Sequence, residues 1–353
     1  MNIWKSIPRA YALSLLSILP AYAADDGEQV VVTATALRES ALETAQPVAV
    51  LGGDDLVRLR EPSLGETLAA QPGISATYFG PQASRPVIRG LGGERVQMYE
   101  DGGDALDVSA LSNDHSVTID PLLAERIEVV RGPATLLYGN GASGGLINVL
   151  TNRVPEIASD DQVSGAFELR GDSALSQRAA AARADGGTGT LAWHVDAHRS
   201  ETSDVRIPGF ALSRQLRELV ENDTRDRLPN TGSETWGGAL GGSWIGDRGL
   251  VGVGMSRYDT DYGITNTGGE EGVRIDMQQR RYDLKGELRD LGHLIRTARL
   301  RATYNDYEHA EVEGSGEVGT LFEQRASDTR HVFDHVPVAG WRGTFGTQYR
   351  DIE

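Results

Sequence analysis

The chain has 353 residues, of which 39% are hydrophobic and 24% charged, so it has room for two or more folded domains. Its formal net charge of −17 disfavours nucleic acid as a partner and favours the attraction of cations. There is no cysteine, so disulfide bonds are excluded and a bound metal ion would need imidazole, carboxylate or carbonyl ligands. After residue 25 no apolar run approaches the roughly 20 residues of a membrane-spanning helix, so a membrane location would require β-strands.

Residues 1–23 are typical of a secretory signal peptide. Lys5 and Arg9 supply positive charge, Ala10–Leu19 forms a short apolar core, and Ala21-Tyr22-Ala23 has the small-residue cleavage pattern. The apolar core is too short for an uncleaved membrane anchor. Cleavage would change the net charge from −17 to −19, because the segment holds two basic residues and no acidic one.

Residues 24–38 are expected to form a polar, extended segment around one β-prone run, Gln29–Thr35. A short apolar strand within polar sequence suits β-augmentation, in which a partner protein adds the segment to the edge of its own sheet. An ordinary first strand would have the same pattern, so the residues alone leave both interpretations open.

Short elements are predicted next. Strands are expected at Pro47–Leu51, Pro86–Gly90 and Arg95–Gly102. Ser63–Glu66 has the pattern of a capping box, in which Ser63 accepts a hydrogen bond from a first-turn amide and Glu66 reaches back. Pro72-Gly73 is expected to end that helix.

The stretch from Glu125 to Asn152 combines two predicted strands with a dense group of glycines. Arg126–Val130 alternates charged and apolar residues, and the strand is expected to end at Arg131-Gly132-Pro133 because proline has no amide hydrogen to donate. A second strand is predicted at Leu146–Leu150. The four glycines between residues 139 and 145 suit tight turns and close backbone packing, which an ordinary hairpin rarely needs.

Arg126–Pro133 and Leu137–Val149 resemble the C-terminal end of the plug domain of TonB-dependent outer-membrane receptors, and Pro86–Gly90 with Arg95–Gly102 resembles another part of that plug. The resemblance implies an α+β plug domain over residues 39–152. It assigns plug architecture to Arg89, Gly90, Asp101, Gly102, Arg131, Gly132, Pro133, Tyr138, Gly139, Gly141, Gly144 and Gly145. It also implies a TonB box at Val30, Val31, Val32, Thr33 and Ala34, with TonB as the partner of residues 29–35.

After a linker at residues 153–161, residues 162–353 alternate apolar and polar residues in the manner of transmembrane β-strands. In Trp193–His198, for example, Trp193, Val195 and Ala197 share one face and the polar residues share the other. A soluble β-sandwich would show the same period. Nine antiparallel strands are predicted, near 162–172, 177–185, 190–200, 234–246, 250–259, 273–289, 294–308, 320–336 and 341–352.

Short predicted turns alternate with longer connections at 201–233, 260–272 and 309–319, as in outer-membrane barrels whose short turns face the periplasm. A closed barrel of nine strands is too narrow to hold a plug domain, whereas the barrels of the resembled family have about 22 strands. The sequence is therefore expected to be the first part of such a receptor. Whether its end at Glu353 reflects a gene truncation or an incomplete sequence stays open.

A candidate metal loop lies in the predicted plug, where Asp114 and His115 are adjacent. They offer one oxygen and one nitrogen donor, as Zn²⁺ or another divalent ion would use, although a solvated loop is the simpler alternative. Ser109–His115, Asp120–Arg126 and Glu271–Asp283 resemble the zinc-uptake branch of these receptors. That resemblance implies that Asp114 and His115 contribute to a metal site whose other ligands come from the barrel.

Other histidines are weaker candidates. His309 and Glu308 lie in a predicted outer loop with further acidic residues and could gather cations, although a charge run is usually a solvated surface. His194 and His198 share one face of a predicted strand and could line the lumen. The predicted outer loop at 266–271 lacks the histidine-rich stretch that the zinc branch often carries.

We therefore expect a monomeric outer-membrane receptor that imports a divalent metal, Zn²⁺ first, with energy from TonB. A ferric siderophore, haem or another metal chelate is the alternative cargo, since Tyr78, Phe79 and Arg85 offer an aromatic and basic plug apex. A passive pore or an adhesion module is a further alternative, although neither needs a TonB box. No nucleophile elbow, P-loop or His-Glu-x-x-His motif is present, so neither catalytic residues nor a catalytic cofactor is expected.

Overall fold

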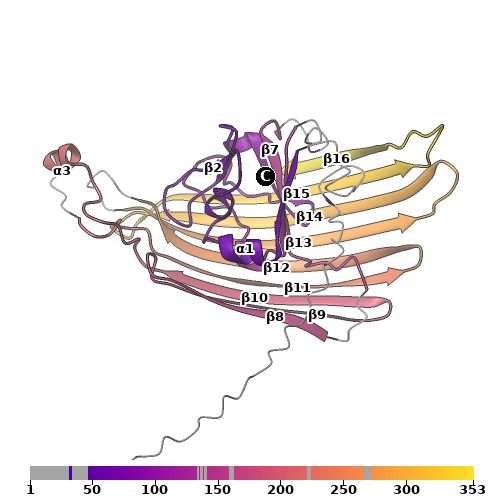
Figure 1. Ribbon diagram of the computed structural model, residues 1–353, viewed down its shortest axis with the longest axis horizontal. Coiled ribbons are helices and arrows are strands. Elements are labelled where there is room, and N and C mark those ends of the chain that lie inside the picture. The colour runs from indigo at the N-terminus through magenta and orange to yellow at the C-terminus, as the bar shows by residue number, and fades with distance from the viewer. Residues whose placement is uncertain are drawn as a thin grey trace, which may run out of the picture.

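Nine consecutive strands of the second half of the chain pair with their sequence neighbours, all antiparallel, in one large sheet. The computed structural model describes residues 32–33, 47–132, 135, 138, 141–158, 163–220, 224–265 and 272–353. The strands are β8 (Val163–Asp172), β9 (Gln177–Thr188), β10 (Leu191–Thr202), β11 (Ser233–Gly246), β12 (Gly249–Gly263), β13 (Arg274–Arg289), β14 (Ile295–Val312), β15 (Val318–His335) and β16 (Thr344–Ile352). Figure 1 shows this sheet as a curved wall with the N-terminal domain set against it. All nine predicted strands are present.

The two faces of the wall have opposite character. Along β10 every second residue is buried, and all the buried residues except Ala192 are polar, His194, Asp196 and His198 among them. The outward residues include Leu240, Val251, Val253 and Met255, which are all exposed. An apolar exposed face and a polar buried face are what a transmembrane barrel requires, and the reverse of a soluble sandwich. No helix in the described part of the chain is long and apolar enough to cross a membrane.

The connections differ at the two ends of the wall. At one end the strands are joined by short turns, at 189–190 and 247–248 for example, and at the other end β10 and β11 are joined by residues 203–232, which include α3 (Arg214–Val220). Figure 1 shows α3 standing away from the sheet at the left. The β14–β15 connection is shorter than predicted, because β14 continues to Val312. His309 therefore lies in a strand and not in an outer loop.

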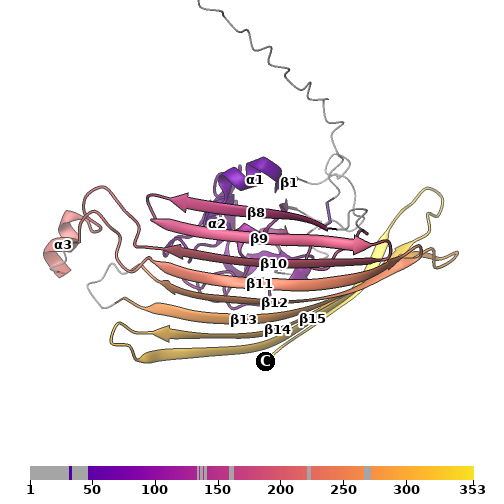
Figure 2. The same cartoon turned by 90° about the horizontal axis from the view of Figure 1, so that it is seen from below.

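The N-terminal domain is built on a five-stranded mixed sheet with the strand order β1-β6-β7-β4-β5, in which only β4 and β7 pair in parallel. Its elements are β1 (Val48–Gly52), α1 (Gly53–Leu59), α2 (Leu64–Leu68), β2 (Ile74–Ala76), β3 (Pro86–Ile88), η1 (Gly93–Arg95), β4 (Val96–Glu100), β5 (Gly103–Asp104), η2 (Pro121–Leu123), β6 (Arg126–Val130) and β7 (Gly145–Leu150). Strands β2 and β3 form a separate hairpin. Turned by 90°, Figure 2 shows the strands of the wall passing across this domain.

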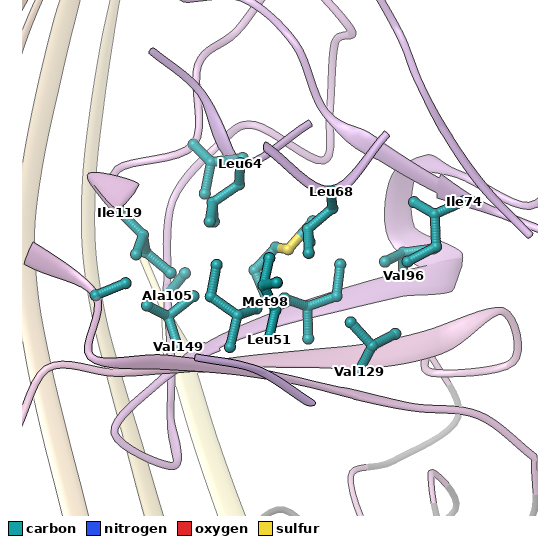
Figure 3. Close-up of a cluster of buried hydrophobic side chains, with 14 of the residues drawn as sticks. Leu51, Leu64, Leu68, Ile74, Val96, Met98, Ala105, Ile119, Val129 and Val149 are labelled. Atoms are coloured by element: carbon teal, nitrogen blue, oxygen red, sulfur yellow. The ribbon is translucent and has the colours of Figure 1, made fainter. Parts of the chain in front are cut away.

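One apolar cluster holds the N-terminal domain together. Leu64 and Leu68 of α2 pack on Met98, Val129 and other residues of the sheet (Figure 3). Helix α2 begins where the sequence predicts, because the Ser63 side chain accepts a hydrogen bond from the Glu66 amide. The Glu66 carboxylate instead accepts a hydrogen bond from Ser84 Oγ, so α2 is tied to the segment before β3.

Residues assigned to plug architecture occupy tight turns and close contacts. Asp101 and Gly102 both have positive φ angles, 50° and 79°, as a two-residue hairpin between β4 and β5 requires. At Gly144 a Cβ atom would come within 2.9 Å of both the Arg95 carbonyl oxygen and Leu91 Cβ. Of the other assigned residues, Pro133 and Gly139 lie outside the described residues, as does the predicted signal peptide.

Candidate metal centre

The loop that carries Asp114 and His115 connects β5 to η2 and is held at its base by one carboxylate. Asp107 accepts hydrogen bonds from the Ser109 amide at 3.0 Å and from the Thr118 amide at 3.1 Å, so it fastens both arms of the loop. Farther out, the Tyr262 hydroxyl of β12 accepts a hydrogen bond from the Ser116 amide and donates one to the Asp114 carbonyl oxygen. The loop is thus fixed both to its own domain and to the wall.

The described side chains bring three potential metal ligands together where this loop meets β14. His115 from the loop meets His309 and Glu311, which are two residues apart and therefore on the same inward face of β14. One ligand atom from each of the three lies within 4.8 Å of the other two. His115 is 3% exposed and His309 is completely buried, and their ring centroids are 4.6 Å apart.

Hydrogen bonds orient both imidazole rings. His115 Nδ1 lies 3.3 Å from the Val108 carbonyl oxygen, which can only accept, so Nδ1 is assigned the proton and Nε2 the lone pair. His115 Nε2 then faces Glu311 Oε1 at 3.4 Å. His309 Nδ1 lies 2.8 Å from the Tyr307 hydroxyl, and its Nε2 is buried without a hydrogen-bond partner among the described residues.

Two imidazoles and a carboxylate form a donor set that suits Zn²⁺ and neighbouring transition metals, whereas Mg²⁺ and Ca²⁺ prefer oxygen ligands alone. Phe322 of β15 stacks on His309 at 4.4 Å between ring centroids and covers that side of the cluster. With Zn–N and Zn–O bonds of about 2.0–2.2 Å, the three ligands would have to draw together by about 1 Å around an ion. The fourth coordination position of a tetrahedral ion would stay open, as it does at sites that release the group they bind.

The remaining predicted ligands are placed differently. The Asp114 carboxylate accepts a hydrogen bond from Ser112 Oγ and is not one of the three clustered residues. Glu308 lies on the opposite, outward face of β14, where it is exposed and faces Glu323 of β15, so it cannot join His309. Glu311 is the carboxylate that lies close to His309 and His115. The two-residue period from His309 is the signal that identifies Glu311 in the sequence.

The proposed aromatic and basic apex of the plug is only partly present. Tyr78 and Phe79 are exposed, but Arg85 is buried at 4% exposure. Its guanidinium donates hydrogen bonds to the Val96 carbonyl oxygen at 3.0 Å and to Ser109 Oγ. Arg85 therefore holds the candidate metal loop in place and does not face a ligand at the surface.

Two residues of the predicted TonB box are described, and both are docked on the N-terminal domain. Val32 is completely buried in a second apolar cluster that includes Tyr99 and Tyr138. The Thr33 amide and hydroxyl donate to the two carboxylate oxygens of Glu128 at 3.1 and 3.0 Å. Val30, Val31 and Ala34 lie outside the described residues.

Buried ion pairs join the N-terminal domain to the wall. Arg153 lies 2.7 Å from Glu100 of β4 and 3.2 Å from Asp283 of β13. Nearby, Asp101 is fully enclosed, which alone would raise the pKa of its carboxyl. The positive charges of Lys285 and Arg153 outweigh burial and hold the pKa of Asp101 at about 2.

A mixed-sheet domain packed by polar contacts inside a wall of strands with an apolar outer face is the architecture of a plugged outer-membrane barrel. The family described as TonB-dependent Receptor Plug Domain matches residues 40–146. Residues 40–146 thus match the plug domain of TonB-dependent receptors, and the nine strands that follow have the fold of part of the barrel of such a receptor. This is a class of receptors and not of enzymes.

Individual relatives agree with this assignment. The chain is 35% identical to a hemin receptor of Yersinia pestis over 140 residues, which are 39% of this chain and 20% of that receptor. It is 26% identical over 262 residues to the vitamin B12 transporter BtuB of Photobacterium profundum, covering 71% of this chain and 40% of the transporter. The solved copper transporter OprC shares the fold with a TM-score of 0.67 at 17% identity, over 86% of this chain and 45% of that structure. The chain spans less than half the length of each of these relatives.

Proposed function

We propose that this chain belongs to a receptor that imports a divalent transition-metal ion, Zn²⁺ first, with energy supplied by TonB through residues 29–35. The observation that carries the proposal is the meeting of His115 from the plug with His309 and Glu311 from the barrel. Imidazole nitrogens facing a carboxylate in a buried space form a favourable arrangement only when a cation or a proton lies between them.

The enclosure of the cluster favours a bare ion over a chelate. Both imidazoles are almost completely buried, and Phe322 closes one side. Haem or a ferric siderophore would need a cavity of several hundred Å³ around it. The relatives are named for hemin, vitamin B12 and copper, and of these only copper is a bare ion. Cu²⁺ is therefore the second candidate, because it binds nitrogen and oxygen ligands more tightly than Zn²⁺ does.

Docking of Val32 and Thr33 supports the TonB part of the proposal. These two residues are held on the plug by one apolar side chain and one carboxylate, and such contacts can be released at modest cost. TonB would pair with the released segment by β-augmentation and pull on the plug. A passive pore would not need a segment of this kind.

Calorimetric titration of the full chain in detergent with Zn²⁺, Cu²⁺ and hemin tests the cargo. We expect Zn²⁺ binding that His115→Ala and His309→Ala each weaken by at least 100-fold, because loss of a ligand exceeds the roughly 10–100-fold cost of losing an outer-shell partner. His293→Ala, at an exposed turn histidine, is the matched control and should bind as the wild type does. Unchanged zinc affinity in both site variants, or binding of hemin alone, would refute the assignment.

The role of the N-terminal segment is tested separately by metal uptake in cells. Val31→Pro removes an amide that a β-augmented segment would donate, so uptake should fall to background while metal binding is retained. Val31→Thr, which keeps the amide and the β-propensity, is the matched control and should preserve uptake. Uptake that survives Val31→Pro would favour a passive pore.

A further inference from the structure

A second group of imidazoles and carboxylates lies on the inward face of β10, on a different part of the wall from β14 (Figure 1). Its members on that strand are His194, Asp196 and His198, each no more than 6% exposed. Successive members are two residues apart along the strand, so their side chains share one face and form a continuous polar stripe against the plug.

Strand register places this stripe between the first metal centre and the short-turn end of the barrel. Through β11, β12 and β13, His198 lies in the same row as Tyr307 of β14, and His194 lies in the row of Thr303. Thr303 is six positions before His309 on β14. At about 3.3 Å per residue, His194 is displaced by about 20 Å along the strand direction from the first centre.

His194 has the hydrogen bonding of a metal-ligating histidine. Its Nδ1 lies 2.7 Å from Asp185 Oδ1 on the neighbouring strand β9, and its Nε2 lies 2.8 Å from Asp196 Oδ2. A carboxylate that accepts from one ring nitrogen and directs the other toward an ion is the usual outer shell of metal-bound histidine. Asp196 is 5% exposed, and its Oδ1 has no partner in the part of the chain that the structure describes.

His194 and Asp196 open onto a cavity of about 520 Å³ between the plug and the wall. Two arginines also line this cavity, but Arg183 is paired with Glu125 and Arg60 with Glu168. The unpaired acidic oxygen of Asp196 is therefore not neutralised by either arginine. The cavity provides both the room and the charge for a partly hydrated divalent ion.

We propose that His194 and Asp196 form a second binding site for a divalent transition-metal ion, which receives the ion after it leaves the first centre. The identity of the ion rests on the proposed function. His194 Nδ1 keeps its proton for Asp185, and a proton on Nε2 passes to water in the cavity when the ion enters between Nε2 and Asp196. Bonds of about 2.0–2.2 Å to both ligands require their 2.8 Å separation to open by a few tenths of an ångström. Water fills the remaining positions from the cavity.

His198 extends this path toward the first centre. Its Nε2 lies 3.1 Å from Asp120 Oδ2, which belongs to the plug. An ion that moves along the stripe therefore passes from a pair shared by plug and barrel to a pair that lies wholly on β10. A site made of barrel residues alone keeps its geometry when the plug shifts, so it can accept the ion while the first centre comes apart.

The alternative is that His194 is simply a charged imidazolium held between two aspartates. Zinc titration of the full chain in detergent micelles separates the two possibilities by stoichiometry. We expect two ions to bind. Asp196→Asn should weaken the second ion at least 10-fold and leave the first unchanged, whereas His115→Ala should remove the first and leave the second. Glu201→Gln, on the exposed outward face of β10, removes a carboxylate from the same strand and should change neither.

A single ion in the wild type that Asp196→Asn does not weaken, or a second ion that Asp196→Asn does not weaken, would overturn the proposal. Retained binding at the first centre shows that a variant is folded, and His194→Gln provides a second test of the same site. If both variants lose the first ion too, zinc anomalous diffraction of the wild type decides. A peak between His194 Nε2 and Asp196 supports the site, and an occupied first centre without such a peak overturns it. Failure of the first centre alone would instead refute the proposed function.

Discussion

Replacement of Asp101 by asparagine should loosen the junction between the plug and the barrel. The Asp101 carboxylate accepts hydrogen bonds from the Thr151 amide at 3.0 Å, the Thr151 hydroxyl at 2.7 Å and the Asn152 amide at 3.3 Å. Its pKa of about 2 lies below the ordinary value of 3.8. At 1.36 kcal/mol per pKa unit, ionisation of this one group contributes about 2 kcal/mol to stability at neutral pH.

Because the pKa is lower in the folded state, this contribution is fully present above about pH 4 and is lost as the pH falls toward 2. Hydrogen exchange of peptides that contain Thr151 and Asn152 measures it, and about 2 kcal/mol corresponds to exchange roughly 30-fold faster in Asp101→Asn at pH 7. The difference from the wild type should shrink near pH 2. Asp54→Asn, at an exposed carboxylate, is the control. Unchanged exchange at pH 7, or a difference that persists at pH 2, would show that the carboxylate does not act through its charge.

Three further predictions concern single side chains. Tyr307→Phe removes the hydroxyl that orients His309 and should weaken Zn²⁺ binding by about 10–100-fold in calorimetry, while Tyr304→Phe on the outward face should not. Glu128→Gln replaces the carboxylate that holds Thr33 and should increase proteolytic cleavage in residues 24–38; equal cleavage rates would exclude this contact as a restraint. Gly144→Ala forces a Cβ atom against backbone and should lower the free energy of unfolding of the plug by about 1–3 kcal/mol in denaturant unfolding. An unchanged free energy of unfolding would show that the loop relaxes around the added methyl group.

Local sequence signals predict the strands of the wall and the start of helix α2, but not how the elements are arranged in space. The two-residue period identified all nine strands of the wall, because an inward polar face and an outward apolar face give a strict alternation. Ser63 likewise identified the start of α2 through its side chain. The plug order β1-β6-β7-β4-β5, with one parallel pair, depends on contacts between distant segments, which no local pattern encodes.

At the candidate metal centre too, the sequence points to a single residue but not to its neighbours in space. Family resemblance points to His115, but the two barrel residues that lie beside it, His309 and Glu311, follow almost 200 positions later, and only folding brings the three together. Residues 309–312 lead directly into a segment rich in glutamate and glycine that is typical of a loop, so the predicted strand ends at residue 308. In a barrel the inward face is itself polar, and β14 continues through them. That misplaced boundary is why Glu308 was preferred to Glu311, although the alternation places only Glu311 beside His309.

His115 belongs to the plug, and His309 and Glu311 belong to the barrel. An ion held by all three would link two parts of the protein that, under the proposed function, separate for the ion to pass. By thermodynamic linkage, whatever free energy the shared ligands contribute to binding also resists displacement of the plug. For a site with a Kd near 1 μM, the binding free energy that opposes displacement of the plug approaches about 8 kcal/mol. The plug is therefore harder to displace when the ion is bound than when the site is empty. A receptor with this geometry would require external mechanical work most when it is carrying cargo.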